Sequence, residues 1–126
     1  STSKNFLQGT PVFSEKYGLV GKIDIYDIKN KTLIERKYKV KKIYDGYKYQ
    51  LYAQYFAMEE RGYKAQKLLI HSLSDNKRYF IPLPSKHEIK QFEEVLNKIR
   101  SFSPNPKENT IISSKLDNCI YKNLYI

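Results

Sequence analysis

Two acidic residues and a lysine stand close together in the segment 21–37, which reads GKIDIYDIKNKTLIERK. Apolar and polar residues alternate around Asp24 and again around Glu35, which predicts two short strands joined by a polar turn at residues 29–31. Side chains two positions apart on a strand share a face, so Glu35 and Lys37 point the same way, and Asp24 can join them if the strands pair as a hairpin. Two carboxylates can share a hard divalent cation, and a lysine beside them can orient an attacking water or stabilise developing negative charge.

The chain has 126 residues, and we expect a single domain over residues 1–126 with a modest hydrophobic core. Its net charge of +10 favours a polyanionic partner, nucleic acid before an anionic membrane surface, although a coding bias toward Lys, Asn, Ile and Tyr could alone produce this excess. No apolar run approaches the roughly 20 residues that span a bilayer, and no secretory pattern is present, so we expect no membrane association. The one cysteine excludes an intrachain disulfide and fits a reducing cytoplasm.

The first half of the chain contains further expected elements. Residues 1–10 are polar and predict a lead-in with little structure, and residues 11–17 predict a first strand. Residues 44–61 predict an amphipathic helix that stops at Gly62. The expected core stripe of that helix is Tyr44, Tyr47, Leu51, Tyr55 and Met58. Gln50 lies beside this stripe.

The second half predicts a hairpin and a helix. Strands at residues 67–72 and 78–83 flank a turn cluster at 74–77. Residues 85–88, Ser-Lys-His-Glu, have the form of a capping box that opens a helix running to about residue 102. Its expected buried stripe is Ile89, Phe92, Leu96 and Ile99. Residues 103–126 predict a C-terminal loop region.

A basic segment directly follows the acidic pair. Lys39, Lys41 and Lys42 belong to the run KYKVKK at residues 37–42. These lysines can hold DNA phosphates next to the proposed site, a contact that positions a strand without reading its sequence. The alternative is an ordinary solvated strand end.

The acidic pair also carries a family resemblance. Asp24 followed by Glu35-x-Lys37 resembles the active-site signature of PD-(D/E)xK nucleases of the RecB type. Together with the words around it, the signature resembles the CRISPR-associated exonuclease family Cas-four over nearly the whole chain. These words are GKID (21–24), LIERK (33–37), YDGYKYQLYAQY (44–55) and NCIYKNL (118–124). The resemblance implies an α/β (α+β) fold with a restriction-endonuclease-like PD-(D/E)xK core, a mixed sheet flanked by helices.

The resemblance implies a role for each site residue. Asp24 and Glu35, together with the main-chain carbonyl of Arg36, would bind Mg²⁺ or Mn²⁺, with waters completing the coordination. Lys37 would orient the attacking water or stabilise the transition state. Gln50 would help to organise the site. The family often has a tyrosine four residues further on, where this chain has a glutamine.

The iron–sulfur cluster of the resembling family is not expected on this chain. The family's C-terminal C-x2-C-x5-C pattern corresponds here to Leu116, Cys119 and Tyr125, so Cys119 is a lone remnant, whereas a 4Fe-4S cluster generally needs four thiolates. The upstream segment with the family's first cysteine and a metal-binding histidine is not in the sequence. We therefore expect a truncated RecB-like nuclease domain. It is either a natural divergent relative or a trimmed or engineered form of a longer parent.

Two functions remain open from the sequence. The first is a divalent-metal-dependent DNA exonuclease, similar to the Cas-four enzymes that process DNA ends for spacer acquisition, with weaker metal binding and slower cleavage than a complete relative. The second is a catalytically weak or inactive module that docks on DNA or on the Cas-one integrase, with Cas-one and Cas-two as the implied protein partners. The presence together of Asp24, Glu35, Lys37 and Gln50 favours the nuclease. A membrane-surface protein has only the net charge in its favour.

Overall fold

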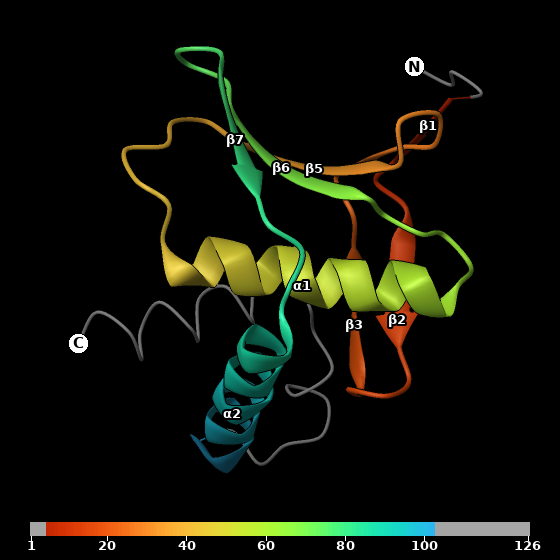
Figure 1. Ribbon diagram of the computed structural model, residues 1–126, viewed down its shortest axis with the longest axis vertical. Coiled ribbons are helices and arrows are strands. Elements are labelled where there is room, and N and C mark those ends of the chain that lie inside the picture. The colour runs from red at the N-terminus through yellow and green to blue at the C-terminus, as the bar shows by residue number, and fades with distance from the viewer. Residues whose placement is uncertain (1–4, 103–126) are drawn as a thin grey trace.

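The structure is a computed structural model, and it describes residues 5–102. Seven strands and two helices lie in this part of the chain (Figure 1). Their bounds are β1 (Phe6–Gln8), β2 (Pro11–Ser14), β3 (Leu19–Lys22), β4 (Ile25–Asp27), β5 (Thr32–Lys37), α1 (Asp45–Glu60), β6 (Lys67–Ser72), β7 (Lys77–Ile81) and α2 (Lys86–Phe102). Neither α1 nor α2 is both long enough and apolar enough to cross a membrane.

Five of the strands form one mixed sheet, in the order β1-β4-β5-β6-β7, and β2 and β3 pair separately as a hairpin. Within the sheet β5 and β6 are parallel, and every other neighbouring pair is antiparallel. A parallel pair needs a long crossover connection, and α1 supplies it. The described chain therefore confirms the predicted mixed α and β class, with helices and strands in one packed arrangement.

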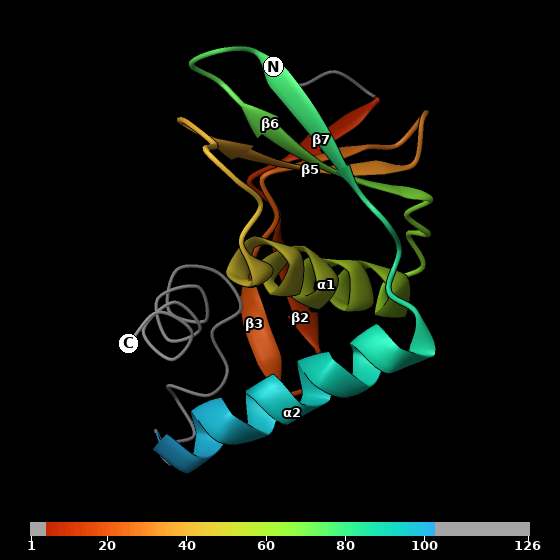
Figure 2. The ribbon, with the colours of Figure 1, turned by 60° about the vertical axis from the view of Figure 1, so that its left-hand side comes forward.

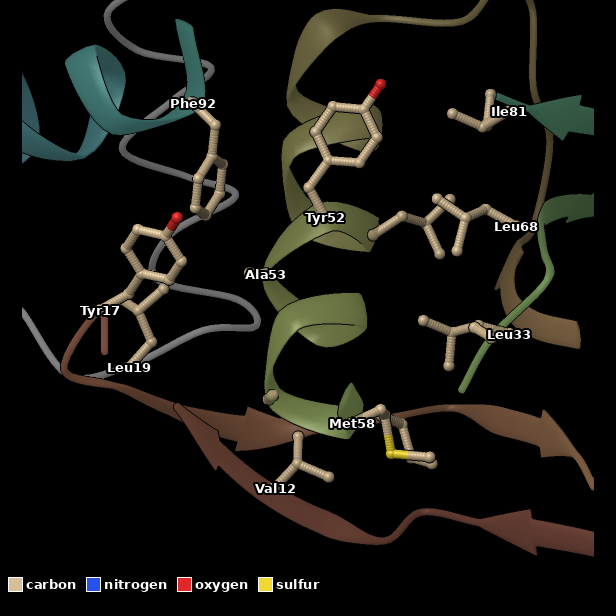
Figure 3. Packing of buried hydrophobic residues seen from close by; sticks show 14 of the residues in the cluster. Val12, Tyr17, Leu19, Leu33, Tyr52, Ala53, Met58, Leu68, Ile81 and Phe92 are labelled. Carbon is tan, nitrogen blue, oxygen red and sulfur yellow. The ribbon is translucent and has the colours of Figure 1, made fainter. Parts of the chain in front are cut away.

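Helix α1 lies at the centre of the packing. Figure 2 shows α1 between the five-stranded sheet and α2. In Figure 3, Leu33 and Leu68 approach α1 from the sheet side, while Leu19 and Phe92 approach from the opposite side. All four side chains are buried. A helix that is covered on two sides buries more than one stripe of side chains, so the buried residues of α1 extend beyond a single apolar stripe.

The predicted single stripe on α1 is therefore wrong in part. Tyr44, Tyr47 and Tyr55 are only half-buried, although Leu51 and Met58 are in the core as expected. The side chains buried in addition to these two are Gln50, Tyr52, Ala53, Gln54 and Ala57. Gln50 thus lies within the buried surface of the helix and not beside it.

The ends of both helices follow their sequence signals. Gly62 has φ +89°, its N–H donates to the carbonyl of Glu59, and the next N–H donates to the carbonyl of Met58. This is the Schellman arrangement, in which a glycine adopts the left-handed conformation without a Cβ clash. At the start of α2, the N–H of Ser85 donates to Glu88 Oε1 and the N–H of Glu88 donates to Ser85 Oγ. The predicted stop and the predicted capping box are both confirmed.

Two expectations for the N-terminal half are wrong. Residues 6–8 form β1 and pair with β4, so the predicted lead-in contains a strand. The first predicted site strand is interrupted, because β3 ends at Lys22 and β4 begins at Ile25. The chain leaves one sheet and enters the other at this point, since β3 pairs with β2 and β4 pairs with β1 and β5. Asp24 consequently lies in a two-residue break just before β4.

Candidate active site

The structure brings three of the predicted site residues into one hydrogen-bonded cluster. Leu33 faces α1 from β5, and Glu35 and Lys37 continue the same face toward the end of the strand. Gln50 lies opposite them on α1. Its Oε1 accepts a hydrogen bond from Lys37 Nζ at 3.1 Å, and its Nε2 donates to Glu35 Oε2 at 3.5 Å. Gln50 therefore links the acidic and the basic side chain of the Glu-x-Lys pair.

A second glutamine, which the sequence did not identify as a site residue, completes this cluster. Gln54 is one turn beyond Gln50, is fully buried, and donates from Nε2 to Glu35 Oε1 at 3.2 Å. Its Oε1 is buried and has no hydrogen-bond partner among the described residues. The i, i+4 spacing of the two glutamines was the available signal, because residues four apart share one face of a helix. Both oxygens of Glu35 are thus oriented by amides from α1.

Asp24 lies next to this cluster, with a different partner. The register of β4 and β5 pairs Ile25 with Ile34, and Asp24 directly precedes Ile25 in the break before β4. Its carboxylate is bound by Arg36, whose backbone N–H and Nε donate to Oδ2 at 2.9 and 3.0 Å and whose Nη2 donates to Oδ1 at 2.7 Å. A carboxylate has about four acceptor positions, so Arg36 occupies most of them.

The main-chain carbonyl of Arg36 lies on the side of Asp24. Along a strand, the N–H and the C=O of one residue point to the same edge, and the next residue points to the other edge. The N–H of Arg36 donates to Asp24, whereas the carbonyl of Lys37 accepts from the N–H of Leu73 beyond β6. The carbonyl predicted as a metal ligand is therefore oriented toward the predicted carboxylate ligand.

The chemistry of these donors fits the predicted cation. Two carboxylates and a carbonyl are hard oxygen ligands, which suit Mg²⁺ and Mn²⁺. Within residues 5–102, no group of three or more His, Cys, Asp or Glu side chains could hold a metal. Mg²⁺ commonly uses one or two carboxylates and keeps several waters. In this chain the guanidinium of Arg36 would have to move away from Asp24 before a cation could bind its carboxylate.

Electrostatics keep Asp24 charged. Burial raises the pKa of its carboxyl, but hydrogen bonds from Arg36 and the positive charges of Arg36 and Lys37 outweigh this and hold the pKa below its ordinary value of 3.8. The side chain of Asp24 is 22% exposed and that of Arg36 is 37% exposed, so solvent screens part of the attraction. Asp24 is consequently an anion throughout the neutral range, as a metal ligand must be.

The ion pair between Asp24 and Arg36 is expected to make the free energy of unfolding depend on pH in the acidic range. Because the folded pKa of Asp24 lies below the unfolded value, its stabilising contribution is complete above about pH 3.8 and is lost as the pH falls through the folded pKa. Urea unfolding of the wild type and of Asp24→Asn should therefore differ most near neutral pH, and the difference should narrow in acid. A difference that stayed constant down to about pH 2 would show that ionisation of Asp24 does not stabilise the fold.

The predicted DNA-binding lysines lie at the rim of the cluster. Lys39, Lys41 and Lys42 are exposed in the loop between β5 and α1. Val40 anchors this loop, since its side chain is buried and its N–H donates to the buried Ser72 Oγ at 3.0 Å. Its lysine neighbours therefore face solvent beside the Glu35–Lys37 end of β5.

The remaining predicted site residue, Cys119, lies outside the described residues, as do the other positions of the family's cysteine pattern. Comparison with known proteins adds no relative, because no protein-family model matches the chain and no curated protein gives a significant match.

Proposed function

We propose that this chain is a divalent-metal-dependent DNA nuclease of the PD-(D/E)xK type, resembling the Cas-four exonucleases. The observation that carries the proposal is the cluster at the end of β5, where Gln50 joins Glu35 to Lys37 and where the backbone N–H of Arg36, between them in sequence, binds the carboxylate of Asp24. The topology supports it, because the Glu-x-Lys strand lies between an antiparallel strand that follows Asp24 and a parallel strand reached through α1.

Each residue of the cluster has a defined task in this proposal. Asp24 and Glu35 would hold a divalent cation, which would supply the acidity that activates a water molecule and would offset charge on the scissile phosphate. Lys37 places a positive charge beside that phosphate and stabilises the negative charge that develops during attack. Gln50 and Gln54 hold Glu35 and Lys37 in position, so little reorganisation is needed when DNA binds.

The lysine rim positions the substrate. Lys39, Lys41 and Lys42 contact phosphates of the DNA strand that enters the cluster, and such contacts carry no sequence information. Cleavage is therefore expected to be sequence-tolerant and sensitive to salt. Processing of DNA ends together with Cas-one and Cas-two is the biological setting that the family resemblance suggests.

The direct test is metal-dependent DNA degradation by the wild type, Glu35→Gln and Glu94→Gln. Glu94 is exposed on α2, away from the cluster, so its variant controls for the loss of one negative charge. The wild type and the control are expected to degrade linear DNA in Mn²⁺ and to stop when EDTA is added. Glu35→Gln is expected to be slower by at least about 100-fold. Equal rates in all three proteins would remove Glu35 from the mechanism.

One observation favours the alternative of a binding module without catalysis. Arg36 already occupies both oxygens of Asp24, and an ion pair of this kind can exist for stability alone. A module of this type binds DNA through the lysine rim, neither binds Mn²⁺ nor cleaves DNA, and behaves identically with and without EDTA. DNA binding without any metal-dependent cleavage would select it.

A further inference from the structure

The face of the five-stranded sheet that points away from α1 carries a separate set of basic and aromatic side chains. Figures 1 and 2 show α1 on one face of the sheet, and no other described helix or strand lies over the opposite face. Alternation along β5 places Ile34 on this outer face, because Leu33 and Glu35 face α1. The strand registers extend the outer row across four strands, through Ile25, Ile34, Leu69 and Phe80.

This apolar row ends in a strongly exposed aromatic ring. Phe80 on β7 is 64% exposed, whereas its cross-strand neighbour Leu69 is only 3% exposed. At the opposite edge, Phe6 pairs with Asp27 and is 42% exposed on the same face. A single exposed ring is ordinary, but two on one uncovered sheet face mark a candidate contact surface.

A cavity of about 470 Å³ lies on this face. Lys29, Lys67 and Arg78 line it together with Phe80. Among the described residues that line it, Asp27 is the one acidic residue. The carboxylate of Asp27 accepts hydrogen bonds from Asn30, at 3.0 Å from the backbone N–H and 2.7 Å from Nδ2, so it is already partnered within its own turn. Three cations against one such carboxylate make the cavity suited to an anion.

We propose that this outer sheet face, formed by Lys29, Ile34, Lys67, Leu69, Arg78 and Phe80, binds single-stranded DNA. The three cations contact phosphates, and an unpaired base stacks on Phe80, which is the combination that recognises single strands without sequence preference. Duplex DNA does not fit as well, because its bases are stacked on one another and offer no face to a protein ring. The net charge of +10 provides complementarity to a polyanion.

This site is separate from the proposed catalytic cluster. Glu35 and Lys37 face α1, whereas Ile34 and its row face away, so the two sites lie on opposite faces of the same strands. A DNA strand held on the outer sheet face does not occupy the cluster. The inference therefore stands whether or not the chain cleaves DNA.

The test is binding of a labelled oligothymidylate, followed by fluorescence anisotropy in EDTA so that cleavage does not contribute. Phe80→Ala is expected to weaken binding by about 5- to 100-fold, and Phe80→Leu is expected to weaken it nearly as much because the flat ring is lost. Both variants should keep the wild-type melting temperature, since Phe80 is mostly exposed.

A second experiment tests the two cationic side chains Lys67 and Arg78. Replacing Lys67 and Arg78 together with glutamine is expected to lower the slope of log affinity against log salt by about 1.4, since each single-strand phosphate contact contributes about 0.7. The control replaces Lys90 and Lys98, both exposed on α2, and is expected to leave the slope unchanged.

Several results would overturn the inference. One is wild-type affinity in Phe80→Ala. Another is an equal loss for single-stranded and duplex DNA, which would leave charge alone as the cause. Competition by polyglutamate as strong as that by DNA would point to an acidic protein partner instead. A wild-type dimer that becomes a monomer in Phe80→Ala would show that a second copy of the chain covers this face. Failure of cleavage with intact binding would count only against the proposed nuclease.

Discussion

Replacing Lys37 with methionine is expected to lower the rate constant for DNA cleavage by about 10²- to 10³-fold. In the proposed mechanism, the charge of Lys37 is needed when negative charge develops on the phosphate, so its loss is expected to act mainly on the transition state. Methionine keeps an apolar stem near the Tyr47 ring, whose centroid lies 4.8 Å from Lys37 Nζ, and the fold should persist. Single-turnover cleavage of labelled linear DNA in Mn²⁺ measures the effect.

Two further lysines separate a catalytic role from simple attraction to DNA. Lys90→Met removes an exposed charge from α2 and is expected to cleave at the wild-type rate. Lys41→Met removes a rim charge and is expected to raise KM while kcat stays nearly constant. If Lys37→Met changed only KM, Lys37 would be another phosphate-binding residue and not a transition-state residue.

Replacing Phe92 with alanine is expected to lower the free energy of unfolding by about 3–5 kcal/mol. Phe92 is fully buried, and its ring centroid lies 5.3 Å from that of Tyr17, 6.2 Å from that of Tyr49 and 5.4 Å from that of Phe56. These rings come from α2, α1 and the turn between β2 and β3. Their number and rigidity limit how far the surroundings can collapse into the space that alanine leaves.

Urea unfolding of Phe92→Ala beside Phe80→Ala checks this expectation. Phe80 is mostly exposed, so its variant should change the unfolding free energy by no more than about 0.5 kcal/mol. The denaturant slope should stay the same for both variants if unfolding remains two-state. Equal, small effects of the two substitutions would mean that α2 does not pack on α1 through Phe92.

Features encoded by neighbouring residues could be predicted from the sequence. The hairpin of β6 and β7, the capping box at Ser85 and the stop at Gly62 all appear where expected. Each depends on contacts between residues close in sequence, where turn chemistry and side-chain period act directly. The placement of Glu35 and Lys37 on one face of β5 was predictable for the same reason, because side chains alternate between faces in any strand.

Features that depend on distant contacts could not be predicted. The burial of Gln54 follows from α1 being covered on both sides, and a polar residue in a helix sequence gives no sign of that. The break at Asp24 arises because the chain changes sheets there, which local alternation does not record. The ion pair with Arg36 depends on that break. There the carboxylate of Asp24, and not a backbone carbonyl of a paired strand, accepts the hydrogen bond from the backbone N–H of Arg36. Strand β1 is likewise stabilised by a distant segment. Its residue Leu7 pairs with Tyr26 of β4, which lies 19 positions further along the chain.

The central claim is that Asp24 and Glu35 share one divalent cation, and Mn²⁺ binding by electron paramagnetic resonance tests it most directly. The wild type is expected to bind one Mn²⁺, and Asp24→Asn and Glu35→Gln are each expected to bind it at least about tenfold more weakly, because each loses a charged ligand. Equal Mn²⁺ affinity in the wild type and both variants would contradict the claim.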